Sequence, residues 1–462
     1  MELTHAVCDR ARLARDARFD GRFFIGVTST RIYCRPICPA PSPKPSNILY
    51  FPSAAAAAEA GFRPCLRCRP ETSPGTPAWL GTSVSVSRGL KLISEGALDE
   101  TSVDNLAERL GLGARHLRRM FLQHLGATPV AVAQTRRVHF AKKLIDETEL
   151  PMTQVAMASG FGSIRRFNAT FQKLYGRTPG DLRKSTARER KGTEAGVYTF
   201  RLGYRPPYNW ASIIGFLGMR AIPGVETITL DEYRRTISLD GKTGFISVRP
   251  VFAKHHLELS IEFPEPAALF RIVERVRNIF DLRADPADVD EHLRRDPRLK
   301  AMVQDHSGMR VPGCWDGFEI AVRAILGQQV SVKGATTMAG RLVARFSQAG
   351  IFPGAEALAD ADLSLIGLTK QRAHSIRELA SAVARGEVSF DASLGLETFE
   401  EAITRLPGIG PWTAQYIAMR IGEPDAFPAG DLYLRSFAKE SEAWRPWRAY
   451  AAMYIWNGSH PL

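Results

Sequence analysis

Long hydrophobic runs are missing from this sequence of 462 residues. No stretch approaches the ~20 apolar residues that a membrane-spanning helix needs. The first residues, MELTHAVCDRARLARDARFDGR, alternate charged and apolar side chains and contain no hydrophobic signal region. These absences predict a cytoplasmic protein that has no membrane partner.

Cysteine is also scarce, with six residues in the whole chain. So few cysteines exclude a disulfide scaffold in a protein of this length. Four of the six form two close pairs, which indicates metal binding or thiol chemistry. Cys8 and Cys314 have no partner nearby in the sequence and are interpreted as structural.

Acidic residues are sparse only in the first part of the chain. Residues 1–191 hold 30 Lys and Arg against 16 Asp and Glu, a net charge of +14, whereas the remainder holds 31 against 32. A basic region suits a polyanion, and nucleic acid is the expected one. A surface charged only for solubility is the alternative.

Shifts in composition divide the chain into four segments, 1–80, 81–187, 197–305 and 306–462, with a charged linker, STARERKGTEAG, at 185–196. The second segment has short amphipathic helices separated by Gly and Pro. The third opens with the strand patterns VYTFRLGY, GFISVRPV and HHLELSIEF, which indicate antiparallel sheet. The last segment is mostly helical. The sequence therefore predicts a multidomain protein, mainly α with α+β parts.

The two cysteine pairs have metal-ligand spacing. Cys34 and Cys38 form C-x-x-x-C, and Cys65 and Cys68 form C-x-x-C after 26 intervening residues. Two such clips can place four thiolates in a tetrahedron around Zn²⁺. The alternative is a set of reduced core cysteines, and nearby arginines argue against such burial: Arg35, Arg67 and Arg69.

A zinc ion with four thiolates carries a formal charge of −2, so it should repel DNA, and alkylation of one sulfur would reduce that charge to −1. The segments FDGRFFIGVTSTRIYCRPICPAP and AGFRPCLRCRP resemble the N-terminal zinc domain of the Ada family of DNA-repair proteins. The resemblance implies that Cys34 irreversibly accepts a methyl group from a methylphosphotriester and that the loss of negative charge strengthens DNA binding. It makes Cys38, Cys65 and Cys68 the remaining zinc ligands.

Residues 101–129 and 151–179 repeat one plan, in which a short helix, a glycine turn and an Arg-containing helix close on G-x-T-P. A helix-turn-helix places its second helix in the major groove. The tandem resembles the AraC-type regulator module, which implies binding to promoter DNA and contact with RNA polymerase. For any single arginine, contact with phosphate alone is the alternative. The groove-facing candidates are Arg115, His116, Arg118, Arg119, Ser163, Arg165, Arg166 and Asn168.

The stretch LPGIGPWTAQYIAMR, 406–420, places Gly408 and Gly410 where a tight turn would join two helices. Exposed N–H groups at the following helix N-terminus can bind a phosphate without a basic side chain, and Thr413 lies in that first turn. A plain helix connection is the alternative. With FEIAVRAILGQQVSV, DAFPAGDLYLRSF and AWRPWRAYAAMYIW, the stretch resembles AlkA-type 3-methyladenine glycosylases of the helix-hairpin-helix superfamily, over most of 198–462.

The glycosylase resemblance implies an enzyme that flips alkylated purines out of double-stranded DNA and hydrolyses their N-glycosidic bond. Asp431 is the candidate carboxylate that stabilises the oxocarbenium-like state while water attacks. Trp412, Tyr416 and Trp456 match the pocket that stacks on the cationic base. Gln329 aligns with the wedge residue of the family, where an apolar side chain is more usual.

Tryptophan at position 412 stands where bifunctional members carry a lysine for Schiff-base chemistry. A monofunctional enzyme that leaves an abasic site is therefore expected. Core packing is the alternative for the aromatic side chains and the preferred interpretation of Trp444 and Trp447. The resemblance leaves open whether a monovalent cation lies under the hairpin, held by carbonyls such as those of Leu406 and Ile409.

Two departures from these families bear on function. The chain lacks the Pro-Cys-His of the Ada methyltransferase, since Cys314 lies in PGCWDGF. Only 12 residues separate Asp431 from Trp444, which predicts a shortened helix after Asp431 and raises the alternative of a displaced carboxylate.

The four segments are thus interpreted as an Ada-type zinc domain, an AraC-type double helix-turn-helix, an AlkA N-terminal-like antiparallel-sheet domain and a helical HhH-GPD domain. The leading hypothesis is a monomeric fusion of a methyl-sensing regulator with a glycosylase for alkylated purines. The alternative is a transcriptional activator alone, whose inactive glycosylase-like half serves for DNA contact.

Overall fold

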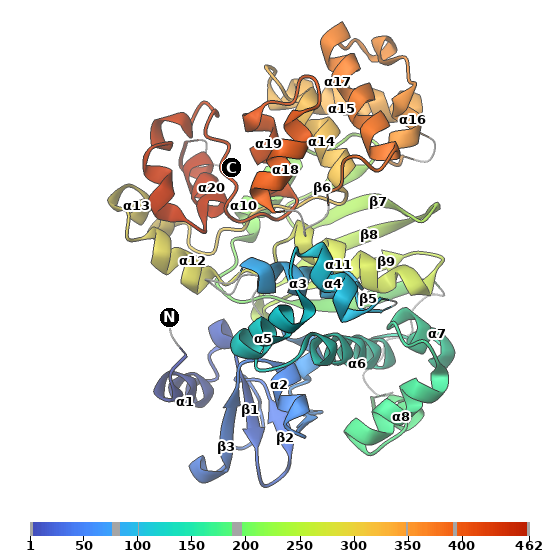
Figure 1. Cartoon of the computed structure of the whole chain (residues 1–462). Helices are drawn as coiled ribbons and strands as arrows, with labels where there is room; N and C mark the ends of the chain where they lie inside the picture. The colour runs from blue at the N-terminus through green and yellow to red at the C-terminus, as the bar shows by residue number, and fades with distance from the viewer. Residues whose placement is uncertain are drawn as a thin grey trace. The chain divides into compact units, whose positions relative to one another are not determined.

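The computed structural model describes residues 3–75, 84–99, 101–186, 196–347, 350–390 and 395–459, which leaves most of the expected linker at 185–196 outside the described residues. The chain divides into two units (Figure 1). The first contains residues 1–206, 251–274 and 282–285, and the second contains 207–250, 275–281 and 286–462. No helix in the described part of the chain is long and apolar enough to cross a membrane.

The first unit begins with a four-stranded sheet in the order β3-β1-β2-β4. Strand β1 is antiparallel to β2 and β3, and β2 is parallel to β4. The alanine run becomes a short helix, capped by the Ser53 hydroxyl. The elements are α1 (His5–Ala14), η1 (Ala17–Phe19), β1 (Phe24–Val27), β2 (Ile32–Cys34), η2 (Pro45–Asn47), β3 (Ile48–Phe51), α2 (Ala54–Glu59), β4 (Arg63–Pro64) and η3 (Pro70–Thr72).

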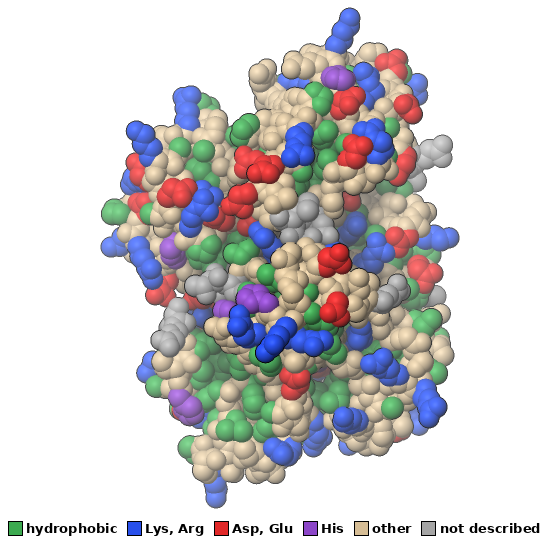
Figure 2. Space-filling model, viewed as in Figure 1, with side chains coloured by type: hydrophobic (Ala, Val, Ile, Leu, Met, Phe, Trp, Pro, Cys, Tyr) green, Lys and Arg blue, Asp and Glu red, His purple; other side chains and the backbone are tan. Residues whose placement is uncertain are grey.

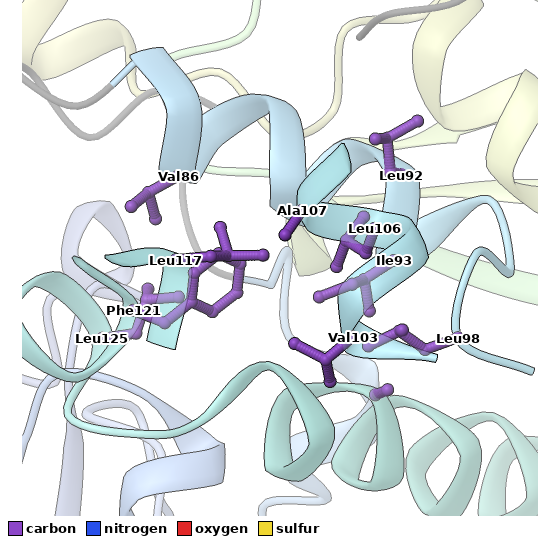
Figure 3. Close-up of a cluster of buried hydrophobic side chains, with 11 residues drawn as sticks. Val86, Leu92, Ile93, Leu98, Val103, Leu106, Ala107, Leu117, Phe121 and Leu125 are labelled. Atoms are coloured by element: carbon purple, nitrogen blue, oxygen red, sulfur yellow. The ribbon is translucent and has the colours of Figure 1, made fainter. Parts of the chain in front are cut away.

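Seven helices follow in the described residues. Two pairs of them, α4 with α5 and α7 with α8, form the expected helix-turn-helix units. Figure 3 shows apolar side chains of α3, α4 and α5 meeting in one buried cluster, with Leu117, Phe121 and Leu125 from α5. Glycines 126 and 176 end α5 and α8 in the left-handed conformation that glycine adopts at no cost. The helices are α3 (Val84–Ser94), α4 (Val103–Arg109), α5 (Ala114–Leu125), α6 (Pro129–Glu147), α7 (Met152–Ala158), α8 (Ile164–Tyr175) and α9 (Pro179–Thr186).

Two strands from the third sequence segment also belong to the first unit, β5 (Val197–Gly203) and β9 (His256–Glu262), which pair antiparallel. Phe140 of α6 packs on Phe200 and Phe270, at ring centroid distances of 6.3 and 4.8 Å. Lys143 of the same helix donates to the backbone carbonyl of Arg201. Antiparallel pairing and aromatic packing therefore group this strand pair with the regulator-like helices. Between and after the strands lie η5 (Phe252–Lys254) and η6 (Pro266–Ala268).

The second unit contains the antiparallel meander β6-β7-β8, of which the sequence predicted only β8. Residues of β7 alternate between buried and half-buried or exposed positions, as expected for a strand with one face on a core. A buried ion pair of 2.7 Å between Arg235 and Glu319 ties this strand to α14 (Gly317–Leu326). The strands are β6 (Glu226–Ile228), β7 (Tyr233–Leu239) and β8 (Lys242–Val251).

Helices make up the rest of the second unit, which confirms the predicted mixture of α and α+β parts. Four apolar residues on α14 are fully buried, so this helix is at the core. The elements are α10 (Trp210–Met219), α11 (Leu269–Ile279, begun in the first unit), α12 (Pro286–Leu293), α13 (Pro297–Asp305), α14 (Gly317–Leu326), α15 (Val332–Phe346), α16 (Ala355–Ala359), η7 (Leu363–Ile366), α17 (Lys370–Ala384), α18 (Leu396–Thr404), α19 (Pro411–Arg420), η8 (Arg435–Phe437), η9 (Glu440–Trp444) and α20 (Arg448–Ser459).

Candidate functional site

The four paired cysteines meet in the first unit. Strand β2 ends at Cys34, and its parallel pairing with β4 includes a 3.0 Å hydrogen bond from the N–H of Cys65 to the carbonyl of Tyr33. All four Sγ atoms lie within 4.8 Å of one another. Tetrahedral Zn²⁺ with bonds of about 2.3 Å needs sulfurs roughly 3.8 Å apart, so this donor set fits zinc.

The expectation that arginines keep the cysteine site unburied is wrong. Cys65 and Cys68 are each 7% exposed, and Arg35 is 9% exposed. Arg35 tolerates burial because its guanidinium pairs with Asp20 and donates to the carbonyl of Cys68 at 3.1 Å. Its backbone N–H also donates to Cys68 Sγ at 3.3 Å, whereas Cys34 remains half-buried.

A buried ionic network joins the cysteine loop to α6. Arg69, which follows Cys68 directly in the left-handed region at φ +51°, contacts Glu71 at 3.1 Å and Asp146 at 2.9 Å. Burial raises the pKa of Glu71, but the charges of Lys142 and Arg69 outweigh it and hold that pKa below its usual value. Glu71 therefore stays ionised next to the metal loop.

Further contacts of the sheet module with the helix-turn-helix module were not predicted from the sequence. The Tyr33 hydroxyl lies 2.9 Å from Nε2 of His139 on α6. The Ser53 hydroxyl donates to the carbonyl of Leu125 at 2.7 Å, at the end of α5. The strand that leads into Cys34 and the end of α5 are thus both fixed by hydrogen bonds between the four-stranded sheet module and the helix-turn-helix module.

The candidate groove-reading side chains lie on α5 and α8, the second helix of each helix-turn-helix. Basic side chains gather in Figure 2 where Figure 1 places α5. Ser163 is the N-cap of α8 and accepts from the N–H of Arg166 at 3.2 Å, so its hydroxyl also has a structural role. All eight candidates are exposed: Arg115, His116, Arg118, Arg119, Ser163, Arg165, Arg166 and Asn168.

The glycine turn joins α18 to α19 in the second unit. Gly408 has φ +78°, and a Cβ there would lie 2.1 Å from the hydroxyl oxygen of Ser375, so both backbone and space require glycine. Gly410 has an ordinary φ of −93°, and a Cβ there would meet nothing within 4 Å. The freedom at Gly410 is thus unnecessary for the fold and leaves room for a ligand at the start of α19.

Thr413 differs from its predicted placement. Its side chain is 3% exposed, and its hydroxyl oxygen accepts a 3.1 Å hydrogen bond from Gln328. Only its backbone N–H, in the first turn of α19, is positioned as an orphan donor at a helix N-terminus. The side chain is therefore a support for the turn.

The three predicted pocket aromatics lie together. Trp412 and Tyr416 stack one helical turn apart, at 5.7 Å and 11°. Trp456 of α20 lies 6.5 Å from the Tyr416 ring, and its Nε1–H donates to Asp431 Oδ1 at 3.0 Å. Trp444 and Trp447 are buried, in agreement with the core interpretation.

Asp431 keeps this position although the chain after it is short. Its Oδ1 also accepts from the N–H of Tyr433 at 3.0 Å, and its carbonyl accepts from the N–H of Arg435 at 3.0 Å. The preceding Gly430 packs on Trp412. Two short 3-10 turns, η8 and η9, follow Asp431, and the carboxylate stays within hydrogen-bond distance of Trp456.

Sequence reasoning missed a group of arginines beside these aromatic side chains. Arg220 lies 3.8 Å from the centroid of the Phe216 ring, and Arg420 donates to the Tyr416 hydroxyl at 2.8 Å. Burial raises the pKa of Tyr416, but three guanidinium groups outweigh it and hold that pKa below its usual value: those of Arg420, Arg220 and Arg323. The sequence signal for each was an arginine in or at the end of a largely apolar stretch, in IIGFLGMR, QYIAMR and FEIAVRAIL.

Four family models match the chain in succession. They are the metal binding domain of Ada at 7–71, a helix-turn-helix domain at 106–185, the AlkA N-terminal domain at 199–316, and the HhH-GPD superfamily base excision DNA repair protein at 322–454. The first model includes the cysteine cluster, and the last includes the glycine turn and Asp431.

A relative from Mycobacterium tuberculosis H37Rv, named probable bifunctional transcriptional activator/DNA repair enzyme AlkA, is 40% identical, covering 98% of this chain and 97% of the relative. The chain belongs to this bifunctional AlkA family. This chain is also 31% identical to DNA-3-methyladenine glycosylase 2 of Escherichia coli K12, over 56% of the chain and 96% of that protein. The chain is also 31% identical to a protein of Bacillus subtilis named bifunctional transcriptional activator/DNA repair enzyme AdaA, over 39% of the chain and 83% of that protein.

Proposed function

We propose that this AlkA-family chain responds to DNA alkylation with two activities, one in each unit. The second unit is a monofunctional DNA glycosylase for alkylated purines, and the first is a methyl-accepting regulator that binds promoter DNA. The observation that carries the enzyme is the Asp431 carboxylate, 3.0 Å from the indole nitrogen of Trp456 and beside a stacked Trp412–Tyr416 pair.

Asp431 supplies negative charge where the sugar becomes an oxocarbenium-like cation. The C1′–N bond breaks with its electron pair moving to the departing base, and water adds to C1′ and loses its proton. Trp412, Tyr416 and Trp456 stack on the everted base and favour a cationic one by cation–π attraction. Because Trp412 stands where a lysine would be needed, no Schiff base forms and the product is an abasic site.

The cysteine cluster is the proposed sensor. Bound Zn²⁺ keeps its thiols deprotonated and hence nucleophilic. Cys34 and Cys38 are half-buried, while Cys65 and Cys68 are buried and Cys68 also accepts a backbone N–H. Of the two half-buried cysteines, the resemblance to the Ada zinc domain favours Cys34. We assign the methyl acceptor to Cys34 Sγ, which forms a bond to the methyl carbon as the carbon–oxygen bond of a methylphosphotriester breaks. The released phosphodiester oxygen keeps the electron pair.

Five finer assignments belong to the same proposal. The protein acts as a monomer and contacts RNA polymerase when bound at promoters. The exposed arginines of α5 and α8 face the major groove, and the N–H groups at the start of α19 hold a phosphate near the lesion. Carbonyls of the hairpin, those of Leu406 and Ile409, are the proposed ligands of a monovalent cation.

Base release from methylated DNA tests the enzyme against the activator-only alternative. We expect the protein to release 3-methyladenine and Asp431→Asn to lower the rate on the order of 10²–10³-fold, since the amide is isosteric but uncharged. The matched control Asp360→Asn changes an exposed carboxylate at the C-cap of α16 and should leave the rate unchanged. Equal release by wild type and Asp431→Asn would remove the aspartate from the mechanism, and a borohydride-trapped protein–DNA adduct would contradict the monofunctional assignment.

A further inference from the structure

The side chain of Gln328 joins two parts of the second unit. Its Nε2 donates to the carbonyl of Gly408 at 2.8 Å and to the hydroxyl oxygen of Thr413 at 3.1 Å. Both amide hydrogens are thereby used, one on an acceptor in the turn between α18 and α19 and one on an acceptor in the first turn of α19. The backbone carbonyl of Gln328 accepts from Arg372 of α17, so the residue is held at both ends.

Each partner of Gln328 adjoins a different proposed DNA contact. Gly408 belongs to the glycine turn that holds the phosphate. Thr413 directly follows Trp412, which belongs to the proposed base pocket. The next residue along the chain is Gln329, the wedge candidate. One carboxamide therefore fixes the spacing among phosphate grip, base pocket and wedge.

The conformation of Gln329 shows that this spacing is imposed. Its backbone lies in the left-handed region at φ +52°, which costs energy for a residue with a side chain, and the residue is exposed. Such strain persists only where neighbouring contacts determine it. For Gln329, these contacts are the hydrogen bonds made by Gln328, the residue directly before it.

We propose that Gln328 is a positioning residue for base flipping, which holds the wedge at a fixed distance from the hairpin and the pocket. This inference rests on the proposed glycosylase function. Eversion requires a wedge in the stack, a held phosphate and a receiving pocket at the same moment. If Gln328 no longer links them, the wedge must be ordered anew in every encounter, and the cost appears only when the base has to be taken out of a stable pair.

Two substitutions test the role, each removing both donors while keeping the length of the side chain. Gln328→Met is neutral, and Gln328→Glu puts a carboxylate against the Gly408 carbonyl. For 3-methyladenine paired with thymine, we expect single-turnover base release to slow about 10-fold or more in both variants. For the same lesion opposite an abasic site, where extrusion costs less, we expect rates within about twofold of wild type. Fluorescence of 2-aminopurine beside the lesion should show less eversion in the paired duplex only.

Controls separate this role from a structural one. Gln304→Glu makes the same charge change at an exposed site on α13 and should match wild type on both duplexes. A loss that is equal on paired and unpaired lesions would show that Gln328 merely supports the fold, and it would overturn the proposal, as would wild-type rates on the paired lesion. Loss in Gln328→Glu alone would assign the effect to repulsion of DNA and also contradict it. Failure of the proposed function would look different, because wild type would then release no base from either duplex.

Discussion

In the proposed function, the two units offer DNA chemically different groups. The first presents guanidinium side chains along α5 and α8, while the second presents backbone N–H groups at the start of α19. The charges follow the same division, since residues 1–191 carry a net +14 and the remainder is nearly neutral. Side-chain cations attract a polyanion over a distance, and salt screens this attraction. Backbone N–H groups bind a phosphate only at hydrogen-bond distance. Charge suits the search for a promoter, and contact geometry suits the placement of one damaged nucleotide.

One of the two largest expected changes in DNA affinity concerns the regulation of the first unit. Wild-type protein should take up one methyl group from DNA with labelled methylphosphotriesters and then bind a selected duplex on the order of tenfold more tightly. One unit charge at about 10 Å and an effective dielectric constant of 20 is worth roughly 1.7 kcal/mol, which corresponds to that factor. Cys34→His should keep a metal ligand, take up no methyl and show no gain in affinity.

Native mass spectrometry measures the zinc content of this variant and so shows whether it still binds the metal. Cys314→Ala, in the second unit, is the matched control and should take up the methyl group like wild type. Methyl uptake by Cys34→His, or a gain in its affinity after treatment, would assign the acceptor elsewhere.

Glycine substitutions sharpen the comparison for the neutral unit. Gly410→Ala adds a methyl group that meets nothing within 4 Å of the chain, so the free energy of unfolding should be unchanged. Affinity for abasic DNA should fall about tenfold, because the methyl group crowds a charge-assisted hydrogen bond worth about 1.5 kcal/mol. Titration with a fluorescent abasic duplex measures this.

Gly408→Ala is the contrasting variant. Its φ of +78° and its approach to Ser375 should lower the free energy of unfolding by about 1–2 kcal/mol or more, seen in urea titrations. Normal DNA affinity in Gly410→Ala would show that the hairpin does not hold a phosphate.

The smallest effect is expected at a single arginine of the charged unit. Arg165→Ala should weaken binding to a selected duplex several-fold and reduce the slope of log affinity against log salt by about 0.9, the value for one phosphate contact. Arg295→Ala, an exposed arginine of the second unit, should leave that slope unchanged. An unchanged slope in Arg165→Ala would exclude a phosphate contact by this side chain.

Features set by short spacing could be predicted from the sequence. Cys34 and Cys38, like Cys65 and Cys68, are brought together by local turns, and the breaks at Gly111 to Gly113 separate α4 from α5 as expected. The helix-hairpin-helix glycines were also found, although only Gly408 needs its positive φ.

Features set by distant side-chain partners could not be predicted. The Tyr33–His139 contact joins residues 106 positions apart, and Thr413 is buried because Gln328, 85 positions away, bonds its hydroxyl. The pairing of β5 with β9 inside the first unit is likewise non-local. Periodicity describes one face of one element and carries no information about which other element covers it.

The packing of Phe140 on Phe200 and Phe270 has a practical consequence for dissecting the gene. A fragment that starts at residue 196 would retain the whole AlkA-like sequence yet lose the aromatic ring that shields Phe200, a side chain with no exposed surface in the intact chain. Such a fragment would expose a new apolar surface and tend to aggregate. Replacing Phe200 by a polar residue is the repair that a truncated enzyme would need.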